Sequence, residues 1–291
     1  MQPTLQTNNH DNVASPVLVR AGRIPPLTHR EATALASSEL ERFLALVESL
    51  ESDEWEKPTV CPLWNVRQML AHVTGAAAAF AHWSQFKRQF LPRGQRPYRE
   101  AGFSMLDALN QIQVDDRATA SSAQLIRELR EAGPRAIGVR NRLPWLLRAL
   151  RLPIPMTPFT GLIPLGYLTD LIFTRDMWMH RLDICRATGH EMTQTREHDG
   201  RITALVVRDL ARILTPKLAG QAVAYELTGI AGGGFCLGEN ARPRASITMD
   251  VLDFHLLAAV RLPANDLPSH TKISGDEHIA RLALDNTQAP Y

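Results

Sequence analysis

The spacing of apolar residues changes once along this chain of 291 residues, near Gly189. Before that point apolar residues recur at helical intervals, as in the stripe formed by Leu40, Phe43, Leu44 and Val47. After one more amphipathic segment, short strand-like runs separated by turn glycines follow. The change predicts a mainly α fold, a bundle of about four long helices, with a C-terminal α+β module.

The sequence also marks where several helices begin and end. One helix is expected to follow Thr28, and Asn65 begins a second with a capping-box pattern that carries it to about Phe90. A further helical region is expected to end near Gly133. The last helix of the bundle is expected over residues 167–188, followed by a glycine of the kind that terminates helices.

The charge balance and the absence of long apolar runs exclude several classes of protein. The formal net charge is +2 and the isoelectric point is about 8.5, so no nucleic-acid partner is predicted. No apolar run is long enough for an integral membrane span, and the first residues lack the apolar centre of a signal peptide. Cys61, Cys185 and Cys236 are widely spaced and odd in number, which favours a reducing, cytoplasmic setting.

These observations divide the chain into three predicted parts. Residues 1–26 are polar and are expected to form a disordered tail. Residues 27–192 are expected to form the helical bundle, and residues 193–291 the α+β module.

The best candidates for chemistry lie on two bundle helices. Asp176 and His180 are four residues apart, so a carboxylate and an imidazole share one helix face. His72 lies among apolar residues on another helix, and sites in bundles are built from inward side chains of facing helices. These three residues predict a divalent metal site with room for a further ligand. The alternative is an exposed Asp176–His180 pair and a hydrogen-bonded core histidine.

Two neighbouring residues of this helix have predicted roles as well. Asp183 follows His180 by three and either orients that imidazole or pairs with an arginine. Arg181 is expected to form an ion pair. Cys61 has no base beside it in the sequence, which favours a packing role for its thiol.

Two motifs resemble those of the mycothiol-dependent maleylpyruvate isomerase family, part of the DinB-like superfamily. They are "TVCPLWNVRQMLAHVTG" at 59–75 and "DMWMHRLDICRATG" at 176–189. The segments "GGGFCLGE", "ASITMDV", "LLAAVRLP" and "KISGDEHIARLAL" resemble the sterol-carrier-like domain fused to these bundles. The resemblance implies a DinB-like four-helix bundle followed by a sterol-carrier-like domain.

The resemblance implies a metal, most often zinc, held by His72, Asp176 and His180. Asp176 departs from the family pattern, which often has the longer glutamate. The family's "GRLP"-like turn reads "VRLP" here, which keeps Arg261 without the preceding glycine. Arg261 is the candidate catalytic residue, as a cation that holds a substrate carboxylate.

The implied function is that of a metal-dependent transferase or isomerase with mycothiol or a similar low-molecular-weight thiol as cosubstrate and a small electrophile as substrate. Two alternatives remain open: a non-catalytic binding module for an apolar ligand, and a metal-dependent hydrolase. The arginine-, leucine- and proline-rich segment 140–166 also has more than one interpretation. It is interpreted as a packed crossover, as a lid in which Arg148 or Arg151 holds an anion, or as an interfacial membrane contact.

Overall fold

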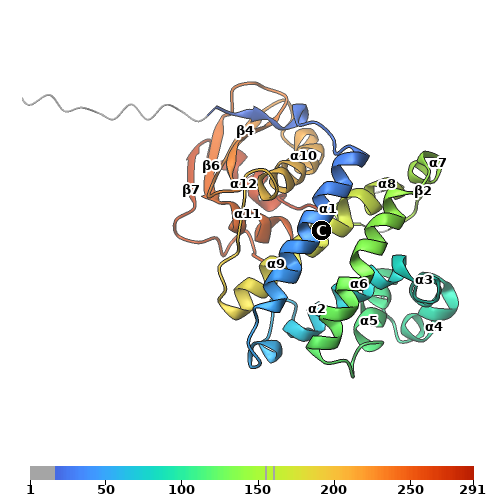
Figure 1. Cartoon of the computed structure of the whole chain (residues 1–291). Coiled ribbons are helices and arrows are strands. Elements are labelled where there is room, and N and C mark those ends of the chain that lie inside the picture. The colour runs from blue at the N-terminus through green and yellow to red at the C-terminus, as the bar shows by residue number, and fades with distance from the viewer. Residues whose placement is uncertain (1–16, 155, 160) are drawn as a thin grey trace, which may run out of the picture.

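The computed structural model describes residues 17–154, 156–159 and 161–291, and most of the predicted tail lies outside these ranges. A helical half packs beside a smaller half built on a sheet (Figure 1). The helices of the first half are α1 (His29–Glu48), α2 (Val66–Ala81), α3 (Trp83–Phe90), α4 (Pro92–Glu100), α5 (Met105–Asp115), α6 (Ser122–Asn141), α7 (Trp145–Ala149), α8 (Leu165–Tyr167) and α9 (Phe173–Thr188). A π-helical turn, η3 (Leu168–Ile172), joins α8 to α9.

Among the described residues, the second half contains five strands and three helices. The helices are α10 (Asp199–Lys217), α11 (Val251–Ala258) and α12 (Glu277–Asp285). The strands are β1 (Val19–Arg20), β4 (Ala222–Thr228), β5 (Gly233–Gly238), β6 (Ala245–Asp250) and β7 (Lys272–Gly275), in the spatial order β1-β5-β4-β6-β7. The predicted fold class, mainly α with a C-terminal α+β module, is confirmed.

Local signals in the sequence predict several helix ends correctly. The side chain of Asn65 accepts a hydrogen bond from the backbone of Gln68, and the side chain of Gln68 accepts one from the backbone of Asn65. Gly189 ends α9 with a φ of 85°, a conformation that glycine adopts without steric cost.

The long helix expected from Asn65 to Phe90 is in fact two helices. His82 has an extended backbone, with φ −136° and ψ 123°, and separates α2 from α3. The turn lets the buried side chain of Gln89 fold back and donate to the backbone carbonyl of Gly75 at 2.9 Å. The chain therefore turns back at His82, and a hydrogen bond joins α3 to α2 where one continuous helix was expected.

The helix expected to end near Gly133 continues to Asn141 instead. Pro134 lies inside α6, and buried positions continue beyond it at Ala136, Ile137 and Arg140. A Cβ at Gly133 would lie 2.6 Å from a methyl group of Leu40, so this glycine allows α6 to approach α1 closely. Burial of the helix face beyond Pro134 outweighs the local signal to stop.

The first described residues belong to the sheet rather than to a disordered tail. Val19–Arg20 pairs in parallel with β5, at Phe235 and Cys236, and Ala21 is fully buried. The predicted tail of residues 1–26 is therefore wrong for its last part. A two-residue pairing with a strand more than two hundred residues away leaves no periodic pattern in the sequence.

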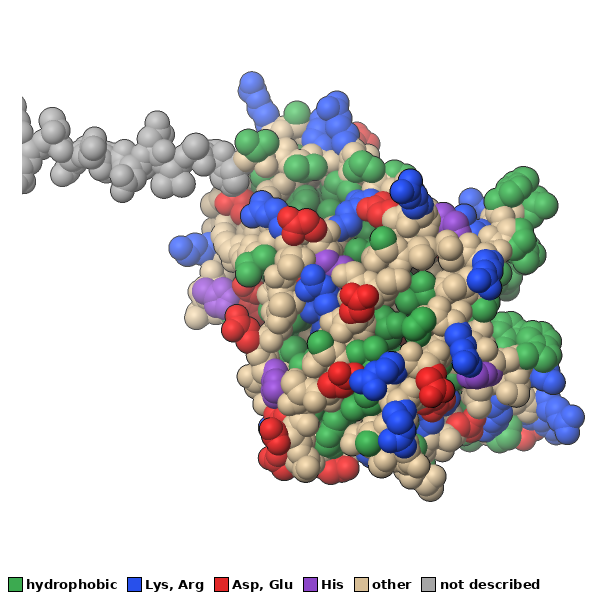
Figure 2. Space-filling model, in the orientation of Figure 1, with side chains coloured by type: hydrophobic (Ala, Val, Ile, Leu, Met, Phe, Trp, Pro, Cys, Tyr) green, Lys and Arg blue, Asp and Glu red, His purple; other side chains and the backbone are tan. Residues whose placement is uncertain are grey.

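The segment 140–166 contains α7 and a short hairpin of β2 (Arg151–Leu152) with β3 (Ile163–Pro164). Apolar side chains gather over α7 at the edge of the molecule (Figure 2), and Trp145 and Leu146 are among the most exposed of them. In the part of the chain that the structure describes, no helix combines the length and apolar character needed to cross a bilayer.

Candidate metal centre

The structure brings His72 of α2 together with Asp176 and His180 of α9. One carboxylate oxygen of Asp176 lies 3.3 Å from Nε2 of His72, and the other lies 3.4 Å from Nε2 of His180. The two imidazole rings meet edge to face, with centroids 4.9 Å apart. One potential ligand atom from each residue lies within 4.8 Å of the others. The helical spacing of Asp176 and His180 and the inward position of His72 produce this cluster.

The donor set fits a divalent cation of the zinc type. Zinc binds imidazole nitrogen and carboxylate oxygen at about 2.0–2.2 Å, so two ligands of a tetrahedral ion lie about 3.4 Å apart. The separations of 3.3 and 3.4 Å, one from each oxygen of Asp176, are close to that value, and one ligand atom from each of the three residues lies within 4.8 Å of the others. Three protein ligands leave one position for another molecule. Despite its shorter side chain, Asp176 reaches both imidazoles.

His180 is oriented by a chain of charged groups that crosses between the two halves of the molecule. Its Nδ1 lies 3.1 Å from Asp183, which is fully buried. Arg261, three residues after α11, donates to both oxygens of Asp183, through Nε and Nη2 at 2.8 Å each. This arrangement fixes the Nδ1–H of His180 on the carboxylate and leaves Nε2 to face Asp176.

The other imidazole is held mainly by packing. The ring of Trp64, in the loop before α2, lies 4.9 Å from the ring of His72. Nδ1 of His72 is buried and has no hydrogen-bond partner among the described residues. His72 is only 4% exposed, whereas the side chain of Asp176 is 27% exposed. The cluster is therefore approached from the side of Asp176.

The charges within the cluster favour a bound cation. Burial alone would raise the pKa of Asp176, but the two imidazoles hold it well below its usual range. Burial alone would lower the pKa of His180, but Asp176 and Asp183 together raise it to about 9. The carboxylates therefore keep the imidazole of His180 protonated near neutral pH. A bound metal ion would replace this proton and supply the positive charge in its place.

The remaining sequence candidates occupy structural contacts. Arg181 forms the predicted ion pair, with Glu39 at 2.8 Å. Burial raises the pKa of the Cys61 thiol although Arg261 opposes the shift, so the thiol stays protonated. Arg148, a candidate anion holder of a lid, pairs with Asp170 instead.

A second cluster of possible ligands was not predicted from the sequence. Glu39, His198 and Asp199 are all buried and lie close together. The guanidinium of Arg181 contacts both carboxylates, and His198 lies 2.7 Å from Glu39. Because the guanidinium already supplies the compensating charge, this cluster is an ion-pair network that joins α1, α9 and α10.

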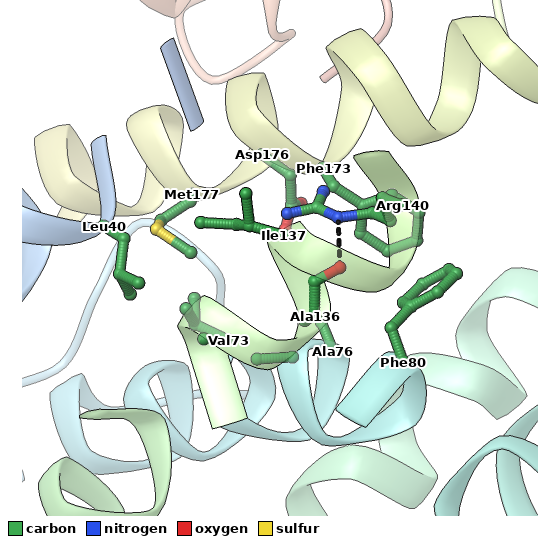
Figure 3. A pocket seen from close by; sticks show the side chains of 12 residues that line it. Leu40, Val73, Ala76, Phe80, Ala136, Ile137, Arg140, Phe173, Asp176 and Met177 are labelled. Carbon is green, nitrogen blue, oxygen red and sulfur yellow. Dashed lines mark hydrogen bonds between the residues drawn. The ribbon is translucent and has the colours of Figure 1, made fainter. Parts of the chain in front are cut away.

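A small pocket opens beside Asp176 in the middle of the bundle (Figure 3). Helices α1, α2, α6 and α9 all contribute to its walls. Apart from Asp176 and Arg140 its lining is apolar: Leu40, Val73, Ala76, Ala77, Phe80, Gly133, Ala136, Ile137, Phe173 and Met177. Of the described residues in segment 140–166, Arg140 alone lines this pocket, and no local pattern in the sequence predicted this position.

The fold and the cluster together define a class of protein: a helical bundle with a histidine–aspartate–histidine cluster between two helices, joined to an α+β module. The family model of the mycothiol maleylpyruvate isomerase N-terminal domain matches residues 36–185. The chain belongs to this family, as its motifs predicted.

Solved structures agree with this assignment at the level of fold. The crystal structure of a mycothiol-dependent maleylpyruvate isomerase is 14% identical, with a TM-score of 0.52, and the match covers 86% of this chain and 95% of that one. A mutant of such an isomerase, with a histidine replaced by alanine, is 14% identical with a TM-score of 0.50, and the match covers 81% and 90%. No curated protein matches the sequence.

Proposed function

We propose that this protein is a metal-dependent enzyme that uses mycothiol, or a similar low-molecular-weight thiol, in a transfer or isomerisation reaction on a small electrophile. The observation that carries the proposal is the convergence of His72, Asp176 and His180, with one potential ligand atom from each residue within 4.8 Å of the others. Family membership supports the thiol, because the matching family and the similar structures are named for mycothiol.

The residues of this chain would hold the cation and keep its surroundings fixed. His72 and His180 would present Nε2, and Asp176 a carboxylate oxygen. A thiol has a pKa near 8.5 and is mostly protonated at pH 7, and a bound divalent cation supplies the charge that favours its thiolate. Asp183 holds the Nδ1 proton of His180, so that this imidazole stays in the tautomer that can bind metal.

Arg261 has a supporting role in the proposal. Through Asp183 it positions His180, since both oxygens of that carboxylate accept from its guanidinium. Its third nitrogen, Nη1, donates no hydrogen bond within the described ranges, and the contact with an anionic substrate expected from the sequence stays a prediction for this group.

The proposal is tested by metal content and thiol dependence. We expect about one zinc ion per chain in the purified protein and a large loss of metal in His72→Ala. His278→Ala makes the same change at an exposed histidine of α12 and should keep its metal. Turnover of a reactive electrophile should require added thiol. Metal-dependent turnover without any thiol would favour a hydrolase, and absence of metal from both proteins would favour a binding module.

A further inference from the structure

Arg140 differs from the other buried arginines in having no carboxylate partner in the part of the chain that the structure describes. Arg117 contacts Glu128, Arg175 contacts Asp209 at 2.9 Å, and Arg181 contacts Glu39 at 2.8 Å. The guanidinium of Arg140 has no carboxylate within 4.0 Å among the described residues, although the residue is only 8% exposed.

The protein offers this guanidinium only weak polar contacts. Nε donates to the backbone carbonyl of Ala136 and Nη1 to that of Thr169, both at the long distance of 3.4 Å. Nη2 donates no hydrogen bond to any described residue. Two hydrogens on Nη2 and one on Nη1 therefore have no acceptor among the described residues.

Asp170 is the carboxylate whose charge acts on Arg140, but it already has two other partners. Asp170 favours the charged form of Arg140, but its own carboxylate contacts Arg148 and lies 3.1 Å from Nδ1 of His29. Burial lowers the pKa of Arg140 to about 10 despite Asp170, so the group is still charged at pH 7. A buried charge without a partner is costly, and an anionic ligand would remove that cost.

The surroundings of Arg140 suit an apolar ligand. Its guanidinium carbon lies 5.3 Å from the ring centroid of Phe173 and 6.0 Å from that of Phe80. Figure 3 shows the guanidinium extending into the pocket that Asp176 also lines. The walls of the pocket between these two charged residues are aliphatic or aromatic. A molecule in it would thus meet one cation and an apolar wall, next to the proposed metal site.

We propose that this pocket selects an apolar monocarboxylate, with the carboxylate on Arg140 rather than on Arg261 and the apolar body extending toward Asp176; this rests on the proposed function, because it names the class of electrophile. The unpaired N–H groups of a guanidinium suit the oxygens of a carboxylate. Among the described residues that line the pocket, Arg140 is the one cationic side chain, so a second negative group would lie unpaired against apolar walls. A phosphate monoester carries close to two charges at pH 7 and suits the pocket less well.

Calorimetric titration of the metal-loaded full chain without thiol tests the assignment. Phenylacetate, phenylacetamide and phenylmalonate share one apolar body and differ in charge, and they undergo no reaction with the protein. We expect phenylacetate to bind about tenfold or more tightly than the neutral amide, and also more tightly than the dianion. Equal affinity for acid and amide in the unmodified protein would overturn the assignment.

Arg140→Met keeps the length of the side chain and removes the charge. It should weaken phenylacetate binding about tenfold or more and leave phenylacetamide binding unchanged, which also shows that the pocket still forms. Arg135→Met makes the same change at an exposed position of α6 and should alter neither affinity. Acid binding that survives in Arg140→Met would place the carboxylate elsewhere, for example on the cation, and would contradict the assignment.

These outcomes are separate from those that test the proposed function. Loss of acid selectivity in the presence of full metal content and thiol-dependent turnover would remove the role of Arg140 alone. Absence of metal from the purified protein would remove the proposed function, while the affinity of the pocket for the acid can still be measured.

Discussion

At the scale of the residue, Val260 lies in a backbone conformation that disfavours its own side chain. Its φ is 58°, and it is 69% exposed, so little packing compensates for the crowding at its branched Cβ. Val260 immediately precedes Arg261, at the position where the resembling family has glycine. The turn that places Arg261 beside Asp183 therefore keeps its left-handed conformation although it has valine in place of glycine.

Val260→Gly should therefore stabilise the protein. Relief of the left-handed strain outweighs the added freedom of the unfolded chain, and we expect a gain of about 1 kcal/mol in the free energy of unfolding. Urea unfolding measures this. Val139→Gly, at an exposed helical position of α6, should instead lose about 0.5–1 kcal/mol. A loss of stability in Val260→Gly would show that the valine side chain makes a contribution that its exposure does not indicate.

The buried carboxylate of Asp183 should matter for metal affinity although it lies outside the ligand set. Asp183→Asn removes the charge that holds both Nδ1–H of His180 and the guanidinium of Arg261. We expect metal affinity to fall about 10- to 100-fold, measured by competition with a chelator. Asp253→Asn changes an aspartate that contacts the exposed His270 and serves as the control. Equal affinities in the two variants would contradict the orienting role.

At the scale of the element, His255 of α11 joins three parts of the chain. Its Nε2 lies 2.9 Å from the hydroxyl of Thr203 in α10, and its Nδ1 lies 2.6 Å from the hydroxyl of Tyr291. Its ring centroid is 4.2 Å from that of Trp178 in α9. Burial, together with the nearby Arg175, lowers the pKa of His255 to about 3.

Because the folded protein keeps His255 neutral, stability should fall in mild acid. An unfolded histidine has a pKa near 6.5, so below that pH the unfolded state binds a proton that the folded state excludes until about pH 3. His255 thus contributes a slope of up to about 1.4 kcal/mol per pH unit in this window. The free energy of unfolding of His255→Gln, measured from pH 6.5 to 4, should fall less steeply than that of the unmodified protein. Exposed His278→Gln should leave the slope unchanged, and parallel slopes for His255→Gln would contradict the prediction.

Element boundaries could be predicted where the signal is local. The Asn65–Gln68 capping box and the glycine after α9 depend on residues within four positions of one another, and both are found. The break at His82 and the continuation of α6 through Pro134 depend on distant partners. They follow from the reach of Gln89 to Gly75 and from the burial of one face of α6.

At the scale of the whole molecule, the two halves are held together by contacts that no local pattern predicts. Val19–Arg20 joins the sheet, Arg261 reaches Asp183 of α9, and Arg175 donates to the backbone carbonyl of Pro290. Helical periodicity placed Asp176 and His180 on one helix face, and the apolar neighbours of His72 indicated an inward position, but an exposed Asp176–His180 pair was an alternative. The contact of Arg261 with Asp183, which supports this cluster, depends on packing between residues far apart in the sequence. The position of Arg140 beside the cluster, without a carboxylate partner among the described residues, depends on such packing as well. Only the structure shows these two features.

X-ray absorption at the zinc edge of the purified protein tests whether His72, Asp176 and His180 bind one cation. We expect a shell of nitrogen and oxygen ligands at about 2.0–2.2 Å with the scattering signature of two imidazoles, reduced to one in any metal retained by His72→Ala. A sulfur-dominated shell from the protein alone, or a spectrum that the loss of His72 leaves unchanged, would contradict this expectation.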